Sequence, residues 1–197
     1  MQLKRIYVAI KGKKPGLLMN KYRIEASDSE QTIKKKKYIP EEEAAKSAYI
    51  TEIDGKKQLY IPALNVYTMM VQACSGMKVD NPEGGRKIAL RALLAGVMQV
   101  VPEKLLFATD KYEIDIRGAR IGKARIPRAR AWLPEWNLNF DIVYDSDWVT
   151  NPNVFMTVLR EASKRFGLGD YRPQHMGPFG TFTIIKFEPS NIIEPEE

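Results

Sequence analysis

The last third of the chain constrains the fold most, because it predicts a strand, a helix, a glycine-rich turn and a closing strand in that order. Residues 137–144 alternate apolar and polar side chains, and residues 152–166 carry apolar side chains at helical spacing after the start signal Asn151-Pro152. The turn at 167–180 holds four glycines, and residues 181–187 complete the pattern. Glycine serves where φ is positive or where another backbone comes close. We therefore expect this turn to approach a second backbone, and a polynucleotide is one candidate.

The remaining pattern predicts three more strands and three more helices. We expect strands at 3–10, 58–61 and 112–117 and helices at 41–48, 63–75 and 86–97. Without a large insertion after the first strand, the order approximates β-α-β-β-α-β. The predicted fold class is therefore α+β, with a ferredoxin-like (RRM-like) antiparallel sheet that carries its helices on one face.

We expect a single domain over residues 1–190, with an insertion at about 11–57 and a basic hairpin at about 112–131. Residues 191–197 are acidic and should form a frayed tail. Length and composition fit one sizeable core, because the chain has 197 residues and is 44% hydrophobic.

The charge balance favours a polyanionic partner. The chain has 31 basic and 24 acidic side chains and a formal net charge of +7, which suits nucleic acid but also a basic surface kept for solubility. No apolar run approaches the ~20 residues that span a bilayer, so we expect no membrane partner. Cys74 is the single cysteine, which excludes an intrachain disulfide, fits a cytoplasmic location and suggests a small buried hydrophobe.

The richest basic segment lies between residues 117 and 130. Six cations alternate there with glycine and small apolar residues, as suits a hairpin along a phosphate backbone. The candidate contacts are Arg117, Arg120, Lys123, Arg125, Arg128 and Arg130. The alternative is a solvated hairpin. Phosphate contacts position a strand without reading its bases, so we expect no sequence selectivity.

The glycine-rich turn is the second candidate contact surface. Its backbone N–H groups would hold phosphates together with cations of the helix before it and of the turn itself. The candidates are Lys164, Arg165, Gly167, Gly169, Arg172, His175, Gly177 and Gly180. The alternative is a packed loop whose glycines only allow the backbone to adopt turn conformations.

His175 is the single histidine, and its reference pKa near neutrality would let a metal-independent ribonuclease use it as acid or base. It fits a phosphate or ribose contact equally well. One cysteine and one histidine cannot form the usual zinc site, and the chain has no P-loop. We therefore expect neither a metal nor a cofactor.

Aromatic side chains offer candidates for base stacking on the open face of the sheet, namely Tyr7, Phe179 and Phe182. For Phe182 a place in the core is the more common outcome. Trp132 and Trp136 flank a turn and should serve packing or an interface.

Three segments resemble the RAMP superfamily, the repeat-associated proteins that build CRISPR effector complexes. Residues 59–73, which contain Ile-Pro-Ala-Leu-Asn-Val-Tyr, are similar to the strand-IPG-small-helix segment at that family's first helix. Residues 133–144 are similar to its P-x-G-x-x-F-x-x-x-I third strand, and residues 167–182 resemble its C-terminal glycine-rich loop. Ala63 stands where the family usually has glycine. The lysine found in the first helix of many type III backbone subunits has no counterpart at 66–70.

The resemblance implies a backbone subunit that holds single-stranded RNA or DNA, with copies side by side along the strand and other complex subunits as further partners. It also implies a thumb near Lys34–Lys37 that wedges Tyr38 or Ile39 between nucleotides. Asp28 lies roughly where type III relatives keep an aspartate for target cleavage. The lysine run fits a solvated loop equally well.

Three other functions stay open. They are a stand-alone single-strand binder of viral or mobile-element type, a metal-independent endoribonuclease, and a scaffold protein without nucleic acid. RNA and DNA both stay open, because phosphate and stacking contacts serve both and only 2′-hydroxyl contacts discriminate.

Overall fold

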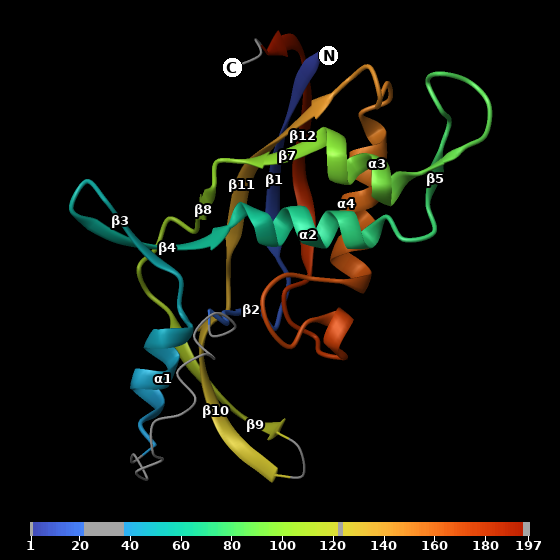
Figure 1. The fold of residues 1–197 in the computed structure, drawn as a ribbon. Helices are drawn as coiled ribbons and strands as arrows, with labels where there is room; N and C mark the ends of the chain where they lie inside the picture. Colours follow the sequence, from blue (N-terminus) through green and yellow to red (C-terminus); the bar gives the residue numbers. More distant parts are fainter. Residues whose placement is uncertain (1, 22–37, 122–123, 195–197) are drawn as a thin grey trace, which may run out of the picture.

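A four-stranded antiparallel sheet forms the centre of the computed structural model, which describes residues 2–21, 38–121 and 124–194. In spatial order the strands are β12 (Phe182–Glu194), β1 (Leu3–Gly12), β11 (Asn137–Asp145) and β7 (Met98–Val101). With helices α2 (Ala63–Ala73) and α4 (Asn153–Arg165), the chain order is β1-α2-β7-β11-α4-β12. This is the ferredoxin-like arrangement, and the predicted fold class is confirmed (Figure 1).

Strand β1 shows why the sheet has one covered face. Ile6, Val8 and Ile10 alternate with partly exposed residues and are fully buried in the core beneath α2 and α4. Each contributes roughly 1.5–3 kcal/mol of transfer free energy. The opposite face is open and carries the ion pair between Arg5 Nη1 and Asp141 Oδ2, 3.1 Å apart.

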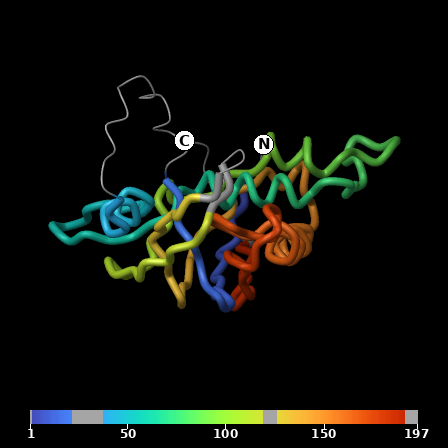
Figure 2. Tube along the Cα trace, turned by 90° about the horizontal axis from the view of Figure 1, so that it is seen from below, coloured from blue at the N-terminus to red at the C-terminus, as the bar shows by residue number. Residues whose placement is uncertain are grey.

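The other elements lie around this sheet. They are β2 (Leu17–Leu18), α1 (Pro40–Ser47), β3 (Ile50–Ile53), β4 (Lys56–Pro62), β5 (Lys78–Val79), β6 (Ile88–Ala89), α3 (Leu90–Val97), β8 (Lys104–Leu106), β9 (Glu113–Ile121) and β10 (Ala124–Leu133). The β3–β4 hairpin and the β5–β6 loop project from opposite ends of the molecule (Figures 1 and 2). Strands β2, β10 and β9 form a second sheet.

Four sequence predictions need correction. The strand expected at 112–117 is β9 of the second sheet, whereas β7 at Met98–Val101, which was not predicted, completes the central sheet. No glycine or proline separates β7 from α3, so its strand character comes from pairing with β11. The helix expected from residue 86 begins at Leu90, because Ile88 and Ala89 pair with β5.

The fourth correction concerns the C-terminal segment. The expected strand end at 187 and the expected fraying of residues 191–194 are wrong, since β12 continues to Glu194 and pairs its last residue with Leu3. The start of β1 offers unpaired backbone groups, and satisfying them outweighs the acidic character of this segment. Residues 195–197 lie outside the described residues.

Helix α1 closes the free edge of β10. Glu43 Oε2 accepts a hydrogen bond from the Ala129 N–H at 2.8 Å, and Ser47 Oγ accepts one from the Ala131 N–H at 2.8 Å. Side chains four apart on a helix are about 6 Å apart, and alternate N–H groups on a strand lie about 6.8 Å apart, so the two spacings match. Arg128 adds a 2.7 Å hydrogen bond to Glu43 Oε1.

Replacing Ser47 by alanine should destabilise the protein by about 1–3 kcal/mol, because the buried N–H of Ala131 loses its acceptor. Urea denaturation measures this difference. The matched control is Lys46→Ala, an exposed change on the same helix that should stay within about 0.5 kcal/mol. Equal effects of the two substitutions would contradict the edge-capping role.

The stabilising role of Glu43 should depend on pH. Burial alone would raise the pKa of Glu43, but hydrogen bonds from the Ala129 backbone and the Arg128 side chain outweigh it and lower the pKa below 4.5. A depressed folded-state pKa stabilises the fold above the unfolded value, and this contribution disappears as the pH falls through the folded pKa. The stability difference between wild type and Glu43→Gln should therefore be full near neutral pH and shrink below pH 4.5. A stability difference between the two proteins that does not change with pH would contradict this role of the ionised Glu43.

Candidate nucleic-acid interface

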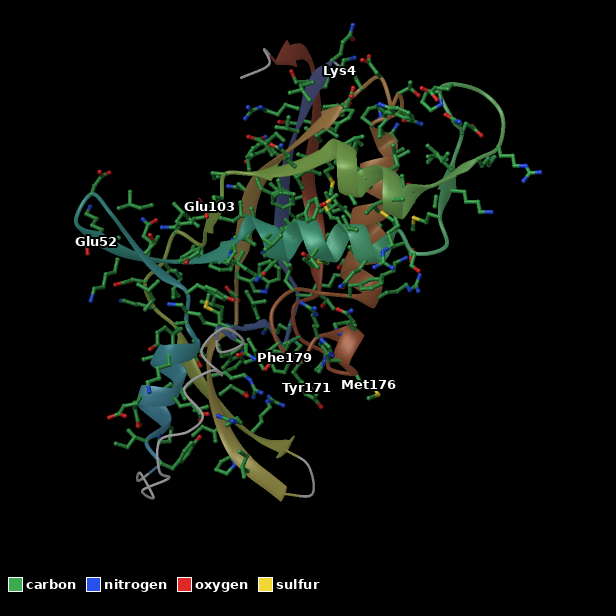
Figure 3. All side chains as sticks on the ribbon, in the orientation of Figure 1. Lys4, Glu52, Glu103, Tyr171, Met176 and Phe179 are labelled. Atoms are coloured by element: carbon green, nitrogen blue, oxygen red, sulfur yellow. The ribbon has the colours of Figure 1, made fainter. Side chains whose placement is uncertain are left out.

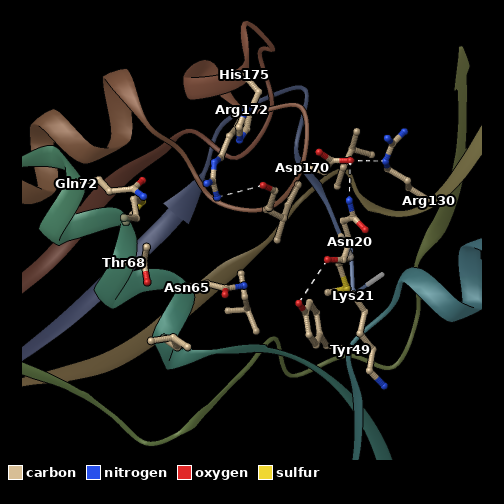
Figure 4. A pocket seen from close by; sticks show the side chains of 17 residues that line it. Asn20, Lys21, Tyr49, Asn65, Thr68, Gln72, Arg130, Asp170, Arg172 and His175 are labelled. Atoms are coloured by element: carbon tan, nitrogen blue, oxygen red, sulfur yellow. Dashed lines mark hydrogen bonds and ion pairs between the residues drawn. The ribbon is translucent and has the colours of Figure 1, made fainter. Parts of the chain in front are cut away.

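A groove of about 600 Å³ lies between α2, residues 17–21 and the glycine-rich loop at 167–180 (Figure 4). Its floor is apolar, formed in part by Leu17, Leu18 and Met69. Its polar lining comes from five separate segments of the chain. These side chains are Asn20, Lys21, Tyr49, Asn65, Thr68, Gln72, Arg130, Asp170, Arg172 and His175.

Helix α2 contributes a polar stripe to this groove. Asn65, Thr68 and Gln72 follow one another at spacings of three and four residues, so they lie on one face, which lines the groove (Figure 4). Val66 and Ala73 are buried in the core. Within the described chain, Gln72 Oε1 is buried and accepts no hydrogen bond. The stripe therefore offers hydrogen-bonding groups along one wall of the groove.

The groove carries a surplus of positive charge. Among the described residues that line it, Lys21, Arg130 and Arg172 stand against one carboxylate, that of Asp170. That carboxylate is already paired, because its Oδ2 lies 2.5 Å from Arg130 Nε and accepts a 3.2 Å hydrogen bond from Asn20. Arg172 Nη2 donates to Gln174 Oε1 at 2.8 Å, which holds the guanidinium in place at the loop. The arrangement suits an anionic chain.

The predicted glycines bring two backbones together, and both belong to this protein. The N–H of Gly180 donates to Gly16 O at 2.8 Å, and the N–H of Asp170 donates to Leu18 O at 2.8 Å. A Cβ on Gly169 would lie 2.3 Å from Leu18 O, and one on Gly180 would lie 1.8 Å from Leu168 O.

Gly167 and Gly177 also pack within the loop. Their added Cβ atoms would come to 2.8 Å from Pro173 Cδ and 1.8 Å from Tyr171 O, respectively. The glycines thus build the wall of the groove. Phosphate contact by the loop backbone stays a prediction.

Three arginines of the basic segment are paired with carboxylates of their own chain. Arg117 Nε lies 2.7 Å from Asp115 Oδ1, Arg128 Nη1 lies 2.7 Å from Glu43 Oε1, and Arg130 pairs with Asp170. Only Arg130 of these three lines the groove.

Two further arginines of the basic segment lie in the described part of β9 and β10. Arg120 and Arg125 are opposite each other in the register of β9 and β10 and are described by their backbone alone. Lys123 lies outside the described residues, as do Asp28 and Lys34–Lys37. The contacts predicted for these residues stay predictions.

Lys164 and Arg165, at the end of α4, do not line the groove. Lys164 lies 3.9 Å from Glu161 and lines a separate shallow hollow with Lys13 and Arg160. The Arg165 guanidinium lies 5.7 Å from the centre of the Phe166 ring. Lys164 and Arg165 therefore lie apart from the cations that line the groove.

His175 is exposed in the short 3₁₀ turn Pro173–His175 and lines the groove. No cluster of three or more potential metal ligands occurs among the described residues. A catalytic role for His175 stays a prediction. Cys74 is fully buried, and burial raises the pKa of its thiol to about 12, which confirms its expected role as a small hydrophobe.

Two of the three proposed stacking residues belong to the core. Phe179 and Phe182 are 1% and 2% exposed, so the prediction that they stack bases on the open face is wrong. Tyr7 does lie on the open face, but Asp141 and Glu188 are its partners in the neighbouring strands. The negative charge of those two carboxylates would repel a phosphate backbone on the open face beside Tyr7.

The tryptophans serve packing, as expected. Trp136 is buried in the core, and Trp132 Nε1 donates a 2.7 Å hydrogen bond to Pro15 O. Seven polar groove residues were not predicted: Asn20, Lys21, Tyr49, Asn65, Thr68, Gln72 and Asp170. Asn65, Thr68 and Gln72 carried a signal, because they form a polar stripe on the otherwise apolar helix at 63–75.

Comparison with known proteins supports the fold. No family model matches the chain, and no curated protein matches it. A solved structure described as the cryo-EM structure of the Type III-B Cmr-beta bound to cognate target RNA contains a similar chain, with a TM-score of 0.57 and 13% sequence identity. The match covers 95% of this chain and 61% of the other, so this chain spans less than two thirds of that subunit. The likeness is one of fold.

Among the described residues, no helix has both the length and the hydropathy that crossing a membrane requires.

The close packing of the loop can be tested with two glycines that both have positive φ. Gly180 has φ 73° and its Cβ position is blocked by Leu168 O, whereas Gly85 has φ 88° and open space around it. Gly85→Ala should cost about 1–2 kcal/mol from backbone conformation alone. Gly180→Ala should cost about 1–3 kcal/mol more, because the loop must also move. Chemical denaturation gives both values, and equal costs would contradict the packing role.

Proposed function

We propose that the groove beside α2 binds single-stranded RNA and that the protein is a repeating backbone subunit of a CRISPR-type ribonucleoprotein complex. The observation that carries the proposal is the groove itself, which combines a surplus of cations with a polar stripe. Further support comes from the fold, which is similar to a chain in a type III-B complex described as bound to target RNA.

The groove's residue types suit a sugar–phosphate backbone. Lys21 and Arg172 offer charged donors for phosphate oxygens. The side chains of Asn65, Thr68 and Gln72 offer neutral donors and acceptors. Such groups suit ribose hydroxyls better than they suit phosphates. A 2′-hydroxyl both donates and accepts and so can pair with either end of these amide and hydroxyl groups, whereas an ionised phosphate only accepts. This favours RNA over DNA.

Binding in this mode tolerates any base sequence, since phosphate and ribose contacts carry no sequence information directly. Each subunit makes few contacts, so copies aligned along one strand would gain affinity through multivalency. Self-association along the strand and contact with other subunits are part of the proposal. Arg117, Arg128 and Arg130 of the hairpin are paired within the chain, so Arg120, Lys123 and Arg125 are the remaining candidates for contact with a neighbouring copy.

Removing one groove cation should change the salt dependence of binding. The affinity of Lys21→Ala for a fluorescein-labelled oligouridylate of 20 nucleotides should fall, and the log–log salt slope should decrease by about 0.7, as expected for one lost contact to a single strand. Fluorescence anisotropy at several salt concentrations measures both. The matched control is Lys57→Ala, an exposed lysine on β4 outside the groove, which should leave the slope unchanged. Equal slopes for the two variants would contradict the groove as the binding site.

Protein purified in moderate salt and treated with nuclease separates this function from its alternatives. Protected RNA of uniform length supports a guide-holding subunit. Fragments of mixed length favour a stand-alone single-strand binder. Protein that carries no nucleic acid and does not bind labelled single strands at low salt would favour the scaffold role. RNA cleavage that His175→Ala abolishes would establish the endoribonuclease.

A further inference from the structure

The glycine-rich loop presents two large apolar side chains to solvent at its outer end. Tyr171 is 42% exposed and Met176 is 94% exposed. Both are non-glycine residues with positive φ, at 45° and 58°. Such conformations cost free energy, and they persist where the surrounding structure holds them for a purpose. Figure 3 shows both side chains at the loop, near Phe179.

The loop backbone fixes Tyr171 in this conformation. Its N–H donates to Asp170 Oδ1 at 2.9 Å, and its carbonyl accepts a 3.2 Å hydrogen bond from the Phe179 N–H. Gly177 packs so tightly on the Tyr171 carbonyl that no side chain fits between them. At Met176, the backbone N–H donates to Pro173 O at 3.0 Å. The two exposed side chains therefore stand on a rigid support.

The Phe179 ring lies close to both the Tyr171 ring and the Arg117 guanidinium. The Tyr171 and Phe179 ring centres are 6.1 Å apart at an interplanar angle of 38°. The Arg117 guanidinium lies 4.8 Å from the Phe179 ring centre. The half-exposed ring of Tyr171 therefore keeps a fixed neighbour on its inner side and offers a flat aromatic surface to solvent.

Tyr171 and Met176 lie on the same loop as two residues of the groove. Arg172 and His175 line the groove, and Tyr171 and Met176 are their direct neighbours in sequence. A strand held by Arg172 would therefore pass close to the loop that presents the two exposed apolar side chains. A nucleobase of that strand is flat, apolar on its faces and able to stack on an aromatic ring whatever its identity.

We infer that Tyr171 and Met176 form a base-stacking platform, on which one unpaired nucleobase rests where the RNA passes the loop. The platform rests on the proposed function, since it needs a strand bound in the groove. It adds one base contact per subunit to a site that otherwise holds only sugar and phosphate, without adding sequence selectivity.

The test uses the full-length protein and a 20-nucleotide oligouridylate with three internal 2-aminopurines, whose fluorescence reports stacking. Tyr171→Phe should bind like wild type, whereas Tyr171→Leu, which keeps an apolar side chain but removes the ring, should bind about fivefold to a hundredfold more weakly. Tyr171→Leu should also abolish the change in 2-aminopurine fluorescence on binding. Lys21→Ala should weaken binding but keep the fluorescence change at saturation.

Met176→Gly tests the platform independently of folding. Glycine relieves the positive φ, so the melting temperature should stay the same or rise while the affinity falls. The matched control is Ile185→Ala, an apolar residue of β12 that is 58% exposed and should leave binding unchanged.

Wild-type binding with no loss in Tyr171→Leu or Met176→Gly would overturn the platform alone. Absence of wild-type binding would overturn the platform and the proposed function together. Unchanged RNA affinity with a shift in oligomeric state would assign the two side chains to a protein interface and likewise overturn the platform.

Discussion

The close contact between the glycine-rich loop and residues 16–18 is the constraint on which the groove depends. Two backbone hydrogen bonds, from Gly180 to Gly16 and from Asp170 to Leu18, join the loop to a segment more than 150 positions away. A side chain at Gly169 would collide with Leu18 O, so glycine is needed there for the approach, and one at Gly180 would collide with Leu168 O within the loop. Once the loop is seated there, Asp170 lies within reach of Arg130 and Asn20. One wall of the groove is thereby fixed.

Charged side chains connect the second sheet with the glycine-rich loop. Arg130 of β10 pairs with Asp170 of the loop, and the Arg117 guanidinium of β9 lies against the Phe179 ring. On the other side of β10, Glu43 and Ser47 of α1 satisfy its free N–H groups. Partly buried ion pairs of this kind are geometrically specific even where they contribute little net stability. The basic composition of this segment therefore serves the fold as well as any ligand.

The sequence predicted the central elements that have a strong period or clear boundary residues. Strand β11 alternates cleanly, and α4 follows Asn151-Pro152, whose Asn151 side chain accepts a hydrogen bond from the Asn153 N–H. Strand β7 escaped prediction because four residues directly after a helix give no period, and its identity depends on a partner 40 residues away. The groove escaped for the same reason, since Lys21, the α2 stripe and the loop meet only in three dimensions. The ion pairs of the arginines at 117, 128 and 130 could not be predicted either, because their partners Asp115, Glu43 and Asp170 are identified only in the folded chain.

The central claim is that a single strand lies in the groove beside α2 and not on the open face of the sheet. Photo-crosslinking of the protein to a 4-thiouridine-containing RNA, followed by mass spectrometry of the linked peptides, tests it most directly. We expect linked peptides from residues 17–21, 63–73 and 167–176, which line or border the groove. Linked peptides confined to β1, β11 and β12 would place the RNA on the open face and contradict the claim.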